Sequence, residues 1–279
     1  MLDTRLPKAD MRLNGGWPSR IYNYFSWSYS CLLLKKQYDD VEIVTDEFGK
    51  SILIDKLQLP YSNVVVRLDE LNKYDSLLWA LGKVYCYSLQ KEPFIHVDGD
   101  IFIYDKFRPD LENAGIVAQN IETEYEIEVS VEFSSIPDYL EGRLTPGKTT
   151  QQYNMGTFGG NDIDLIHQYT KEAFSFVEKN YIGILASPTG KINCIFEQVL
   201  LFHYLAEKKI PVSCIFDPHP NLPENTFFFN PGPIAENYIH LAGSLKEYLF
   251  YYKTLEIRLA NEFPDVYQKI LRLYAAMEI

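Results

Sequence analysis

The stretch 96–102, His-Val-Asp-Gly-Asp-Ile-Phe, constrains the fold of this 279-residue chain most strongly. Two short apolar segments, 93–97 and 101–104, flank the carboxylates Asp98 and Asp100. Apolar segments of this length are typical of buried strands. Two carboxylates at the end of a buried strand cannot easily both stay charged unless a cation lies nearby. The stretch therefore predicts a strand end that holds a divalent metal ion, which could also bind a diphosphate.

Asp-x-Asp spacing is a weak signal by itself, because a chain this rich in aspartate can contain it by chance. A second copy, Asp162-Ile163-Asp164, is present. We expect this second copy to open a helix, since the partially positive N-terminus of a helix favours carboxylates. For Asp98 and Asp100, a polar turn after a strand is the alternative to a metal site.

The length and the 47% hydrophobic content support one large domain, or one domain with a helical appendage. The formal net charge of −12 argues against a nucleic-acid-binding surface, because phosphate backbones are bound by basic patches. An acidic protein that binds an anionic diphosphate needs local positive charge. A metal ion and one or two well-placed lysines would supply it.

The four cysteines are scattered and form no Cys-x-x-Cys pair, so we expect buried free thiols and a cytoplasmic protein. They are Cys31, Cys86, Cys194 and Cys214. Residues 1–16 lack the apolar core of a signal peptide. No apolar run reaches the roughly 20 residues that span a bilayer.

Strands and helices are expected to alternate along the chain. Helices are expected over 19–37, 75–90, 162–180, 191–208 and most of 244–278. Strands are expected over 41–45, 63–67, 93–98, 115–118, 212–216 and 238–241, and 153–160 joins a short strand to a glycine turn. This order predicts an α/β domain with a mixed, mainly parallel sheet flanked by helices. Ligands of such folds bind beyond the carboxyl ends of the strands, where we expect Asp46, Asp98, Asp100 and Asn154.

A third pattern, His240-x-x-Gly243-x-x-Lys246, follows the last expected strand. A histidine at a strand end can offer an imidazole nitrogen to a metal such as Mn²⁺. Gly243 would let the backbone approach a ligand closely, and Lys246 near a helix start could reach a phosphate oxygen. The alternative is a hydrogen-bonded histidine and a solvated lysine.

These motifs together resemble those of retaining glycosyltransferases of the GT-A fold. The most similar groups are glycogenin and the bacterial lipooligosaccharide galactosyltransferases, and the resemblance runs from about residue 40 to 247. The motifs, in family order, are Val97-Asp98-Gly99-Asp100, Asn154-x-Gly156-x-Phe158-Gly159-Gly160, Glu197-Gln198 and His240-x-x-Gly243-x-x-Lys246. The last motif is the most specific to this family.

The resemblance implies a GT-A, Rossmann-like nucleotide-diphospho-sugar transferase fold and a role for each matching residue. Asp98, Asp100 and His240 would bind Mn²⁺ or Mg²⁺, and the metal would bridge the phosphates of a UDP-sugar. Residues implied to bind the donor are Asp46, Lys83, Asp98, Asn154, Gly156, Gly243 and Lys246. Glu197 and Gln198 would lie beside the reacting sugar as the catalytic candidates.

The chain departs from the family pattern in two places. No clear first strand is visible in residues 1–16. The family commonly has Asp-Gln-Asp where this chain has Glu197-Gln198-Val199, so the catalytic base or nucleophile is not assigned.

We expect a retaining hexosyltransferase, as in the family that the chain resembles, that serves bacterial glycan biosynthesis with a carbohydrate, lipid-linked or protein acceptor. An inverting GT-A enzyme, a nucleotidyltransferase and a non-catalytic carbohydrate-binding protein are the alternatives. A catalytic domain is expected over 1–246, with a helical extension over 247–279 packed on it. That extension could also contact a membrane peripherally or form a homodimer.

Overall fold

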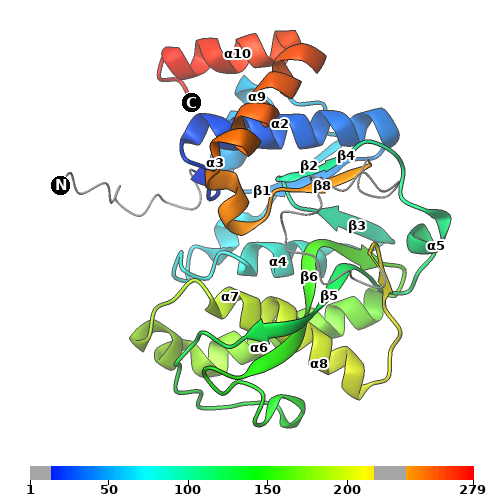
Figure 1. Ribbon diagram of the computed structural model, residues 1–279, viewed down its shortest axis with the longest axis vertical. Coiled ribbons are helices and arrows are strands. Elements are labelled where there is room, and N and C mark those ends of the chain that lie inside the picture. The colour runs from blue at the N-terminus through cyan, green and yellow to red at the C-terminus, as the bar shows by residue number, and fades with distance from the viewer. Residues whose placement is uncertain (1–13, 217–236) are drawn as a thin grey trace. The chain divides into compact units, whose positions relative to one another are not determined.

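The computed structural model describes residues 14–216 and 237–279 of a mixed α/β protein (Figure 1). Residues 1–13 and 217–236, which fall in the segment expected to form the catalytic domain, lie outside the described residues. The described chain divides into two compact units, each with its own hydrophobic core. Unit 1 comprises 14–69, 98–106 and 237–279, and unit 2 comprises 70–97 and 107–216.

Unit 1 combines short strands with three longer helices. In chain order it contains α2 (Arg20–Gln37), β1 (Glu42–Thr45), α3 (Glu47–Gly49), the π-helix η1 (Lys50–Lys56), β2 (Asn63–Val66), β4 (Ile101–Ile103), β8 (Tyr238–His240), the 3-10 helix η6 (Gly243–Glu247), α9 (Leu249–Glu262) and α10 (Pro264–Ala275). Strands β1 and β2 are parallel, whereas β4 and β8 are antiparallel.

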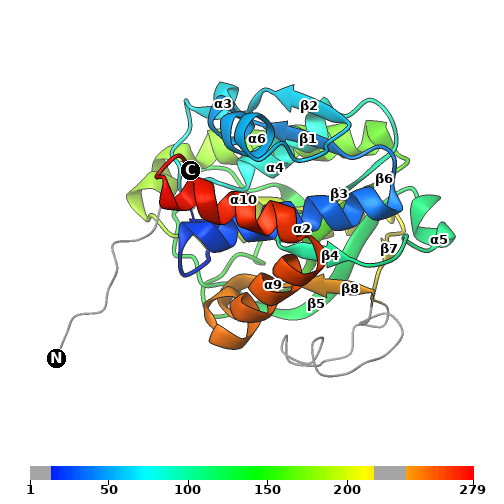
Figure 2. The same cartoon turned by 90° about the horizontal axis from the view of Figure 1, so that it is seen from above.

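The long helix α2 organises the core of unit 1. Figures 1 and 2 both show α9 and α10 lying against α2, in agreement with their contacts. Tyr29 on α2 is fully buried, and its ring lies 5.2 Å from that of Phe102 on β4 and 6.0 Å from that of Phe263. Its hydroxyl donates a 2.6 Å hydrogen bond to Glu262, and burial raises the pKa of Tyr29. The C-terminal helices are therefore part of the core of unit 1.

Unit 2 is built around a four-stranded sheet with the order β3-β6-β5-β7. Its elements are α4 (Leu81–Leu89), β3 (Phe94–Val97), α5 (Pro109–Glu112), β5 (Val117–Glu126), the 3-10 helix η3 (Asp138–Leu140), β6 (Thr149–Gly160), α6 (Ile163–Ala186), α7 (Ile192–Cys194), the π-helix η4 (Ile195–Val199), α8 (Leu200–Glu207) and β7 (Ser213–Cys214). Gly159 is required where β6 meets β3, since an added Cβ would lie 2.1 Å from the carbonyl oxygen of Phe94.

The expectation of a mainly parallel sheet is wrong for the described strands. In the main sheet, β6 is antiparallel to both β3 and β5, and only β5 and β7 are parallel. The physical reason lies in the connection between β5 and β6, which contains only the short helix η3. Parallel neighbours need a long crossover, usually through a helix, whereas antiparallel neighbours do not.

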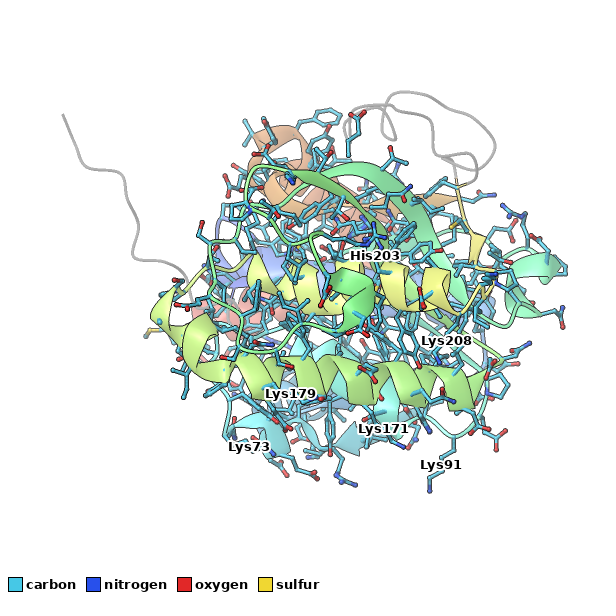
Figure 3. All side chains as sticks on the ribbon, turned by 90° about the horizontal axis from the view of Figure 1, so that it is seen from below. Lys73, Lys91, Lys171, Lys179, His203 and Lys208 are labelled. Carbon is cyan, nitrogen blue, oxygen red and sulfur yellow. The ribbon has the colours of Figure 1, made fainter. Side chains whose placement is uncertain are left out.

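Helices α4, α6 and α8 contribute the apolar side chains that complete the core of unit 2. Figure 3 shows His203 on α8, and Lys171 and Lys179 extending from α6. The imidazole Nε2 of His203 lies 2.9 Å from Thr150 Oγ1 on β6. Burial lowers the pKa of His203 to about 4, so the ring is neutral at physiological pH and links α8 to β6.

Most expected elements are confirmed, with corrections at their boundaries. The helix expected over 75–90 begins at Leu81, and β5 and β6 are much longer than expected. Residues 47–56 form α3 and η1, where no helix was expected. All four cysteines are free thiols, as expected, but only Cys31 and Cys214 are buried, whereas Cys86 and Cys194 are partly exposed. In the part of the chain that the structure describes, no helix is long and apolar enough to cross a membrane.

Candidate functional site

The Asp98-Gly99-Asp100 segment forms a tight turn immediately before β4. Ile101 N donates a 3.0 Å hydrogen bond to Asp98 O, which closes the turn. Ser26 of α2 donates a 2.7 Å hydrogen bond to the carbonyl oxygen of Gly99. The buried helix α2 therefore fixes the backbone on which both carboxylates are mounted.

Gly99 lies against the indole ring of Trp27. A Cβ added at Gly99 would lie 2.6 Å from Trp27 Cε2 and 2.7 Å from Cδ2, closer than atoms in proteins approach. The middle residue of the motif must therefore be glycine here for a packing reason.

We expect Gly99→Ala to lower the free energy of unfolding by about 1–3 kcal/mol, the usual cost of overpacking. It should also weaken metal binding, because relieving the clash must move the turn or Trp27. Urea denaturation and Mn²⁺ titration would measure the two effects. The double variant Gly99→Ala/Trp27→Ala has room for the new methyl group and should regain metal affinity. If Gly99→Ala alone binds the metal with wild-type affinity, the contact between Gly99 and Trp27 does not hold the metal-binding turn in place.

Antiparallel pairing of β8 with β4 brings His240 to the turn. The register places His240 opposite Ile101, and Leu241 N donates a 3.0 Å hydrogen bond to Asp100 O. As a result His240 Nε2 lies 3.6 Å from Asp100 Oδ1. Each of Asp98, Asp100 and His240 offers one ligand atom, and these atoms all lie within 4.8 Å of one another.

Lys246 completes the cluster from η6. Its Nζ lies 2.6 Å from Asp100 Oδ2 and donates a 2.8 Å hydrogen bond to Gly15 O. The side chains of Lys246 and Asp100 are only 13% and 12% exposed, so this ion pair is shielded from water. Gly243, with φ +53°, provides the left-handed turn that leads β8 into η6.

The donor set fits a divalent metal ion. Oxygen ligands lie about 2.0–2.6 Å from Mg²⁺ or Ca²⁺, so atoms within 4.8 Å of one another can share one ion. Two carboxylates and one imidazole suit Mn²⁺, and Mg²⁺ accepts the oxygens with added waters. Three protein ligands leave coordination positions for oxygen atoms of a substrate. The cluster is a candidate metal centre.

A second group of predicted residues lies in unit 2. Lys83 on α4 and Glu197 in the π-helix η4 form an ion pair with Nζ and Oε1 2.6 Å apart. The Glu197 side chain is fully buried and that of Lys83 is 15% exposed. Tyr169 donates a 2.7 Å hydrogen bond to Glu197 O, and burial, reinforced by the Glu197 charge, raises the pKa of Tyr169. Single π-helical turns inside helices frequently occur at functional sites.

Asn154 is connected to that ion pair through the backbone of β6. Gly156 N donates a 3.0 Å hydrogen bond to Asn154 Oδ1, and Lys83 donates a 3.0 Å hydrogen bond to Met155 O. The structure therefore brings Asn154, Gly156, Lys83 and Glu197 into one hydrogen-bonded group. Gln198 is half-buried next to Glu197 in the same helix. Asn154 lies inside β6, not at a strand end as expected.

Asp46 follows β1 in unit 1, where its side chain has a structural task. Its Oδ1 accepts a 2.6 Å hydrogen bond from Gly49 N and so caps α3. Among the predicted residues of unit 1, the structure brings together Asp98, Asp100, His240 and Lys246, and no contact of Asp46 with them is found among the described residues.

Sequence reasoning missed Glu122 in unit 2. Its Oε1 accepts a 3.0 Å hydrogen bond from Asn154 Nδ2, and its Oε2 accepts one from Gln152 Nε2. A carboxylate only accepts hydrogen bonds, so Glu122 fixes which way both amides face. The only signal that identifies it is its pairing opposite Gln152 in the β5–β6 register. That register is not visible without the structure.

The second Asp-x-Asp copy has the expected structural role. Asp162 is the N-cap of α6, and its Oδ1 accepts a 3.0 Å hydrogen bond from Leu165 N. Asp164 is an exposed residue of the first helical turn. This copy therefore supplies a matched control for the first.

The chain belongs to a protein family of unknown function, DUF6734, whose model matches residues 5–273. None of the curated proteins compared with the chain matches it.

Proposed function

We propose that this protein is a metal-dependent glycosyltransferase that moves a sugar from a UDP-sugar to an acceptor, built on a GT-A fold. The observation that carries the proposal is the cluster of Asp98, Asp100 and His240 with Lys246 bound to Asp100. Motif order along the chain, from Asp-Gly-Asp to His-x-x-Gly-x-x-Lys, supports the same class. The mixed α/β architecture is compatible with it.

The residues of the cluster suit the binding of a diphosphate. Asp98, Asp100 and His240 would hold Mn²⁺ or Mg²⁺, which when bound neutralises charge on the phosphate oxygens. Lys246 already lies on Asp100, so a small movement of its ammonium group would give it a phosphate oxygen as an additional acceptor. A positive group held at that position stabilises the negative charge of a leaving diphosphate.

The resemblance implies that Asn154 and Gln198 contact the transferred sugar. Glu122 and Gly156 N bind two sides of the Asn154 amide, which leaves its second Nδ2 hydrogen to donate to a sugar hydroxyl. Held in this way, Asn154 selects a hydroxyl oxygen at a fixed position. Glu122 is thus a positioning residue for Asn154.

The environment of Glu197 supports retention over inversion. An inverting enzyme needs a carboxylate base that can reach the acceptor hydroxyl. Glu197 is fully buried and paired with Lys83 at 2.6 Å, which makes it a poor base for an incoming acceptor. Its charge can instead steady the positive character that develops on the sugar as the bond to the leaving group breaks.

A thermal-shift panel of UDP-sugars, each with and without Mn²⁺, tests this proposal. Bound ligand raises the melting temperature, by mass action on the folded state. We expect one UDP-sugar to raise it only when Mn²⁺ is present, and slow release of free UDP to accompany binding. Binding of free sugars without any need for Mn²⁺ or nucleotide would favour a non-catalytic carbohydrate-binding protein. Proton NMR of the anomeric linkage in the product would separate retention from inversion.

A further inference from the structure

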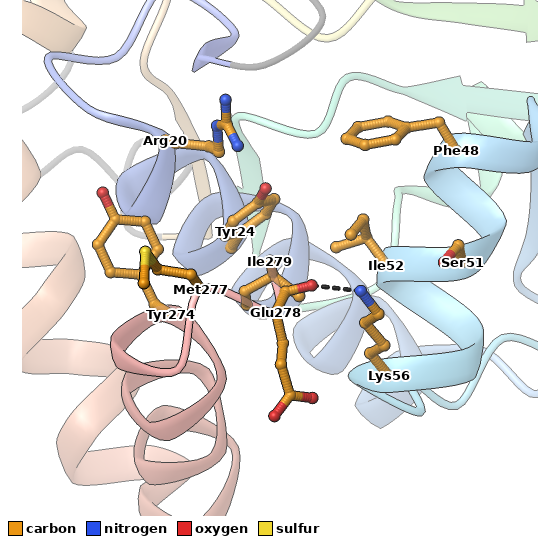
Figure 4. A pocket seen from close by; sticks show the side chains of 10 residues that line it. All are labelled: Arg20, Tyr24, Phe48, Ser51, Ile52, Lys56, Tyr274, Met277, Glu278 and Ile279. Carbon is orange, nitrogen blue, oxygen red and sulfur yellow. Dashed lines mark hydrogen bonds between the residues drawn. The ribbon is translucent and has the colours of Figure 1, made fainter.

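A pocket of about 640 Å³ lies in unit 1, lined by the start of α2, by α3 and η1, and by the end of α10 and the turn after it (Figure 4). The lining side chains that matter for its chemistry are Arg20, Tyr24, Phe48, Lys56, Tyr274 and Met277. None of them belongs to the candidate metal centre or to the Lys83–Glu197 group. The pocket is therefore separate from both of those groups.

The pocket holds two half-buried positive charges, Arg20 and Lys56, and one exposed carboxylate, Glu278. Within residues 14–216 and 237–279, neither side chain forms an ion pair; Lys56 instead donates a hydrogen bond to the carbonyl oxygen of Glu278 (Figure 4). This is unusual in a chain that has 38 acidic and only 26 basic residues. Positive charges withdrawn from water without a carboxylate partner favour the binding of an anion.

The Tyr24 hydroxyl is a second sign of a ligand. Tyr24 is 4% exposed, and its buried hydroxyl has no hydrogen-bond partner that satisfies normal geometry. In Figure 4 the hydroxyl lies on the side of the ring toward Arg20. Burial raises the pKa of Tyr24, and both the positive charge of Arg20 and a weak hydrogen bond from its guanidinium oppose that rise. Buried hydroxyls are almost always hydrogen-bonded, so an oxygen acceptor is missing at this position.

The rim of the pocket is apolar and open to solvent. Phe48, Tyr274 and Met277 are 48%, 37% and 91% exposed, and they are three of the large hydrophobic side chains that the described part of unit 1 leaves exposed. Two aromatic rings and a flexible thioether beside a polar floor match ligands with a flat apolar body. The charged residues Arg20 and Lys56 and the apolar rim together suit a molecule that is charged at one end only.

We propose that this pocket binds a small organic phosphate monoester with a flat apolar body. Two cations match the charge of a phosphate monoester, which is about −1.5 to −2 at neutral pH. Arg20 and Lys56 would hold the phosphate, Tyr24 would donate to one of its oxygens, and Phe48 and Tyr274 would pack on the apolar body. The site is independent of the transferase proposed above.

Calorimetric titration of the full-length protein with phenyl phosphate tests the proposal, without Mn²⁺ or any sugar nucleotide. We expect phenyl phosphate to bind, inorganic phosphate to bind more weakly and benzyl alcohol, which has no charge, to give no heat. Arg20→Gln and Lys56→Gln should each weaken binding about tenfold or more, as the loss of a charge-assisted hydrogen bond does. Lys36→Gln, which removes an exposed charge at the other end of α2, should leave the affinity unchanged.

Tyr24→Phe separates a binding role from a structural one. Because no acceptor for the hydroxyl proton is found among the described residues, removal of the hydroxyl should leave the melting temperature close to the wild-type value or higher. The same variant should bind phenyl phosphate several-fold more weakly. The proposal is overturned if phenyl phosphate gives no heat with the wild type. It is also overturned if Arg20→Gln, Lys56→Gln and Lys36→Gln bind alike, or if benzyl alcohol binds as tightly as phenyl phosphate.

Discussion

Asp100→Ala is expected to abolish Mn²⁺-dependent binding of a UDP-sugar while leaving the fold intact. Asp100 contributes one of three ligand atoms and also holds Lys246 at 2.6 Å, so the change removes a metal ligand and frees the lysine at once. The affinity for Mn²⁺ should fall by more than about 100-fold, because losing an outer-shell partner alone costs about 10–100-fold. Titration calorimetry with Mn²⁺, and then with UDP-sugar in the presence of Mn²⁺, measures both losses.

Two further variants make this experiment specific. Asp164→Ala alters the other Asp-x-Asp copy at an exposed position of α6 and should leave Mn²⁺ binding unchanged. His240→Ala should weaken Mn²⁺ binding, but by less than either aspartate change, since both carboxylates remain. If Asp100→Ala and the wild type give equal titration heats with Mn²⁺, Asp100 is not a metal ligand. No effect of His240→Ala on Mn²⁺ affinity would make the resemblance at the C-terminal motif accidental.

The second large effect is expected at the buried ion pair of unit 2. Glu197→Gln should lower the free energy of unfolding by about 3–5 kcal/mol, as breaking a buried pair from one side does. The reason is that Lys83, only 15% exposed, loses the carboxylate that lies 2.6 Å from its ammonium nitrogen. Lys83→Met should cost a similar amount, because the buried carboxylate of Glu197 then loses its counter-charge. Chemical denaturation of both single variants measures these losses.

The double variant Lys83→Met/Glu197→Leu tests what the pair is for. Replacing both members of a buried pair by apolar residues of similar size is often neutral or stabilising, so most of the lost stability should return. If the pair acts on the transferred sugar, the double variant should still bind Mn²⁺ and UDP but should no longer transfer sugar. A stable double variant with wild-type transfer rates would show that the pair serves stability alone.

How much could be predicted from the sequence differs between the two candidate sites. The residues of the metal centre were all predicted, because carboxylates, histidine and lysine with fixed spacings are visible in a linear pattern. The packing that supports them was not: Ser26 and Trp27 hold the Gly99 turn from a helix more than 70 residues earlier. Nothing in the sequence around α2 indicates that contact.

The main sheet of unit 2 and the hydrogen bonds around Asn154 were predicted less well, for a related reason. Strands β5 and β6 carry glutamate and glutamine at many positions, residues that are not enriched in strands, so most of their length was not recognised. Their antiparallel pairing, once formed, places Glu122 opposite Gln152 and within reach of Asn154. The direction and register of a strand pair depend on partners distant in sequence, and local propensity does not contain them.

The sequence alone determined the candidate metal ligands, the helical tail, the free cysteines and the structural role of the second Asp-x-Asp copy, because each depends on residue type and local spacing. Only the tertiary structure decided that β8 pairs with β4 so that His240 reaches Asp100, that Glu197 is buried against Lys83, and that Arg20 and Lys56 line one pocket. These contacts join residues far apart in the chain, and only the burial of a common core brings such residues together.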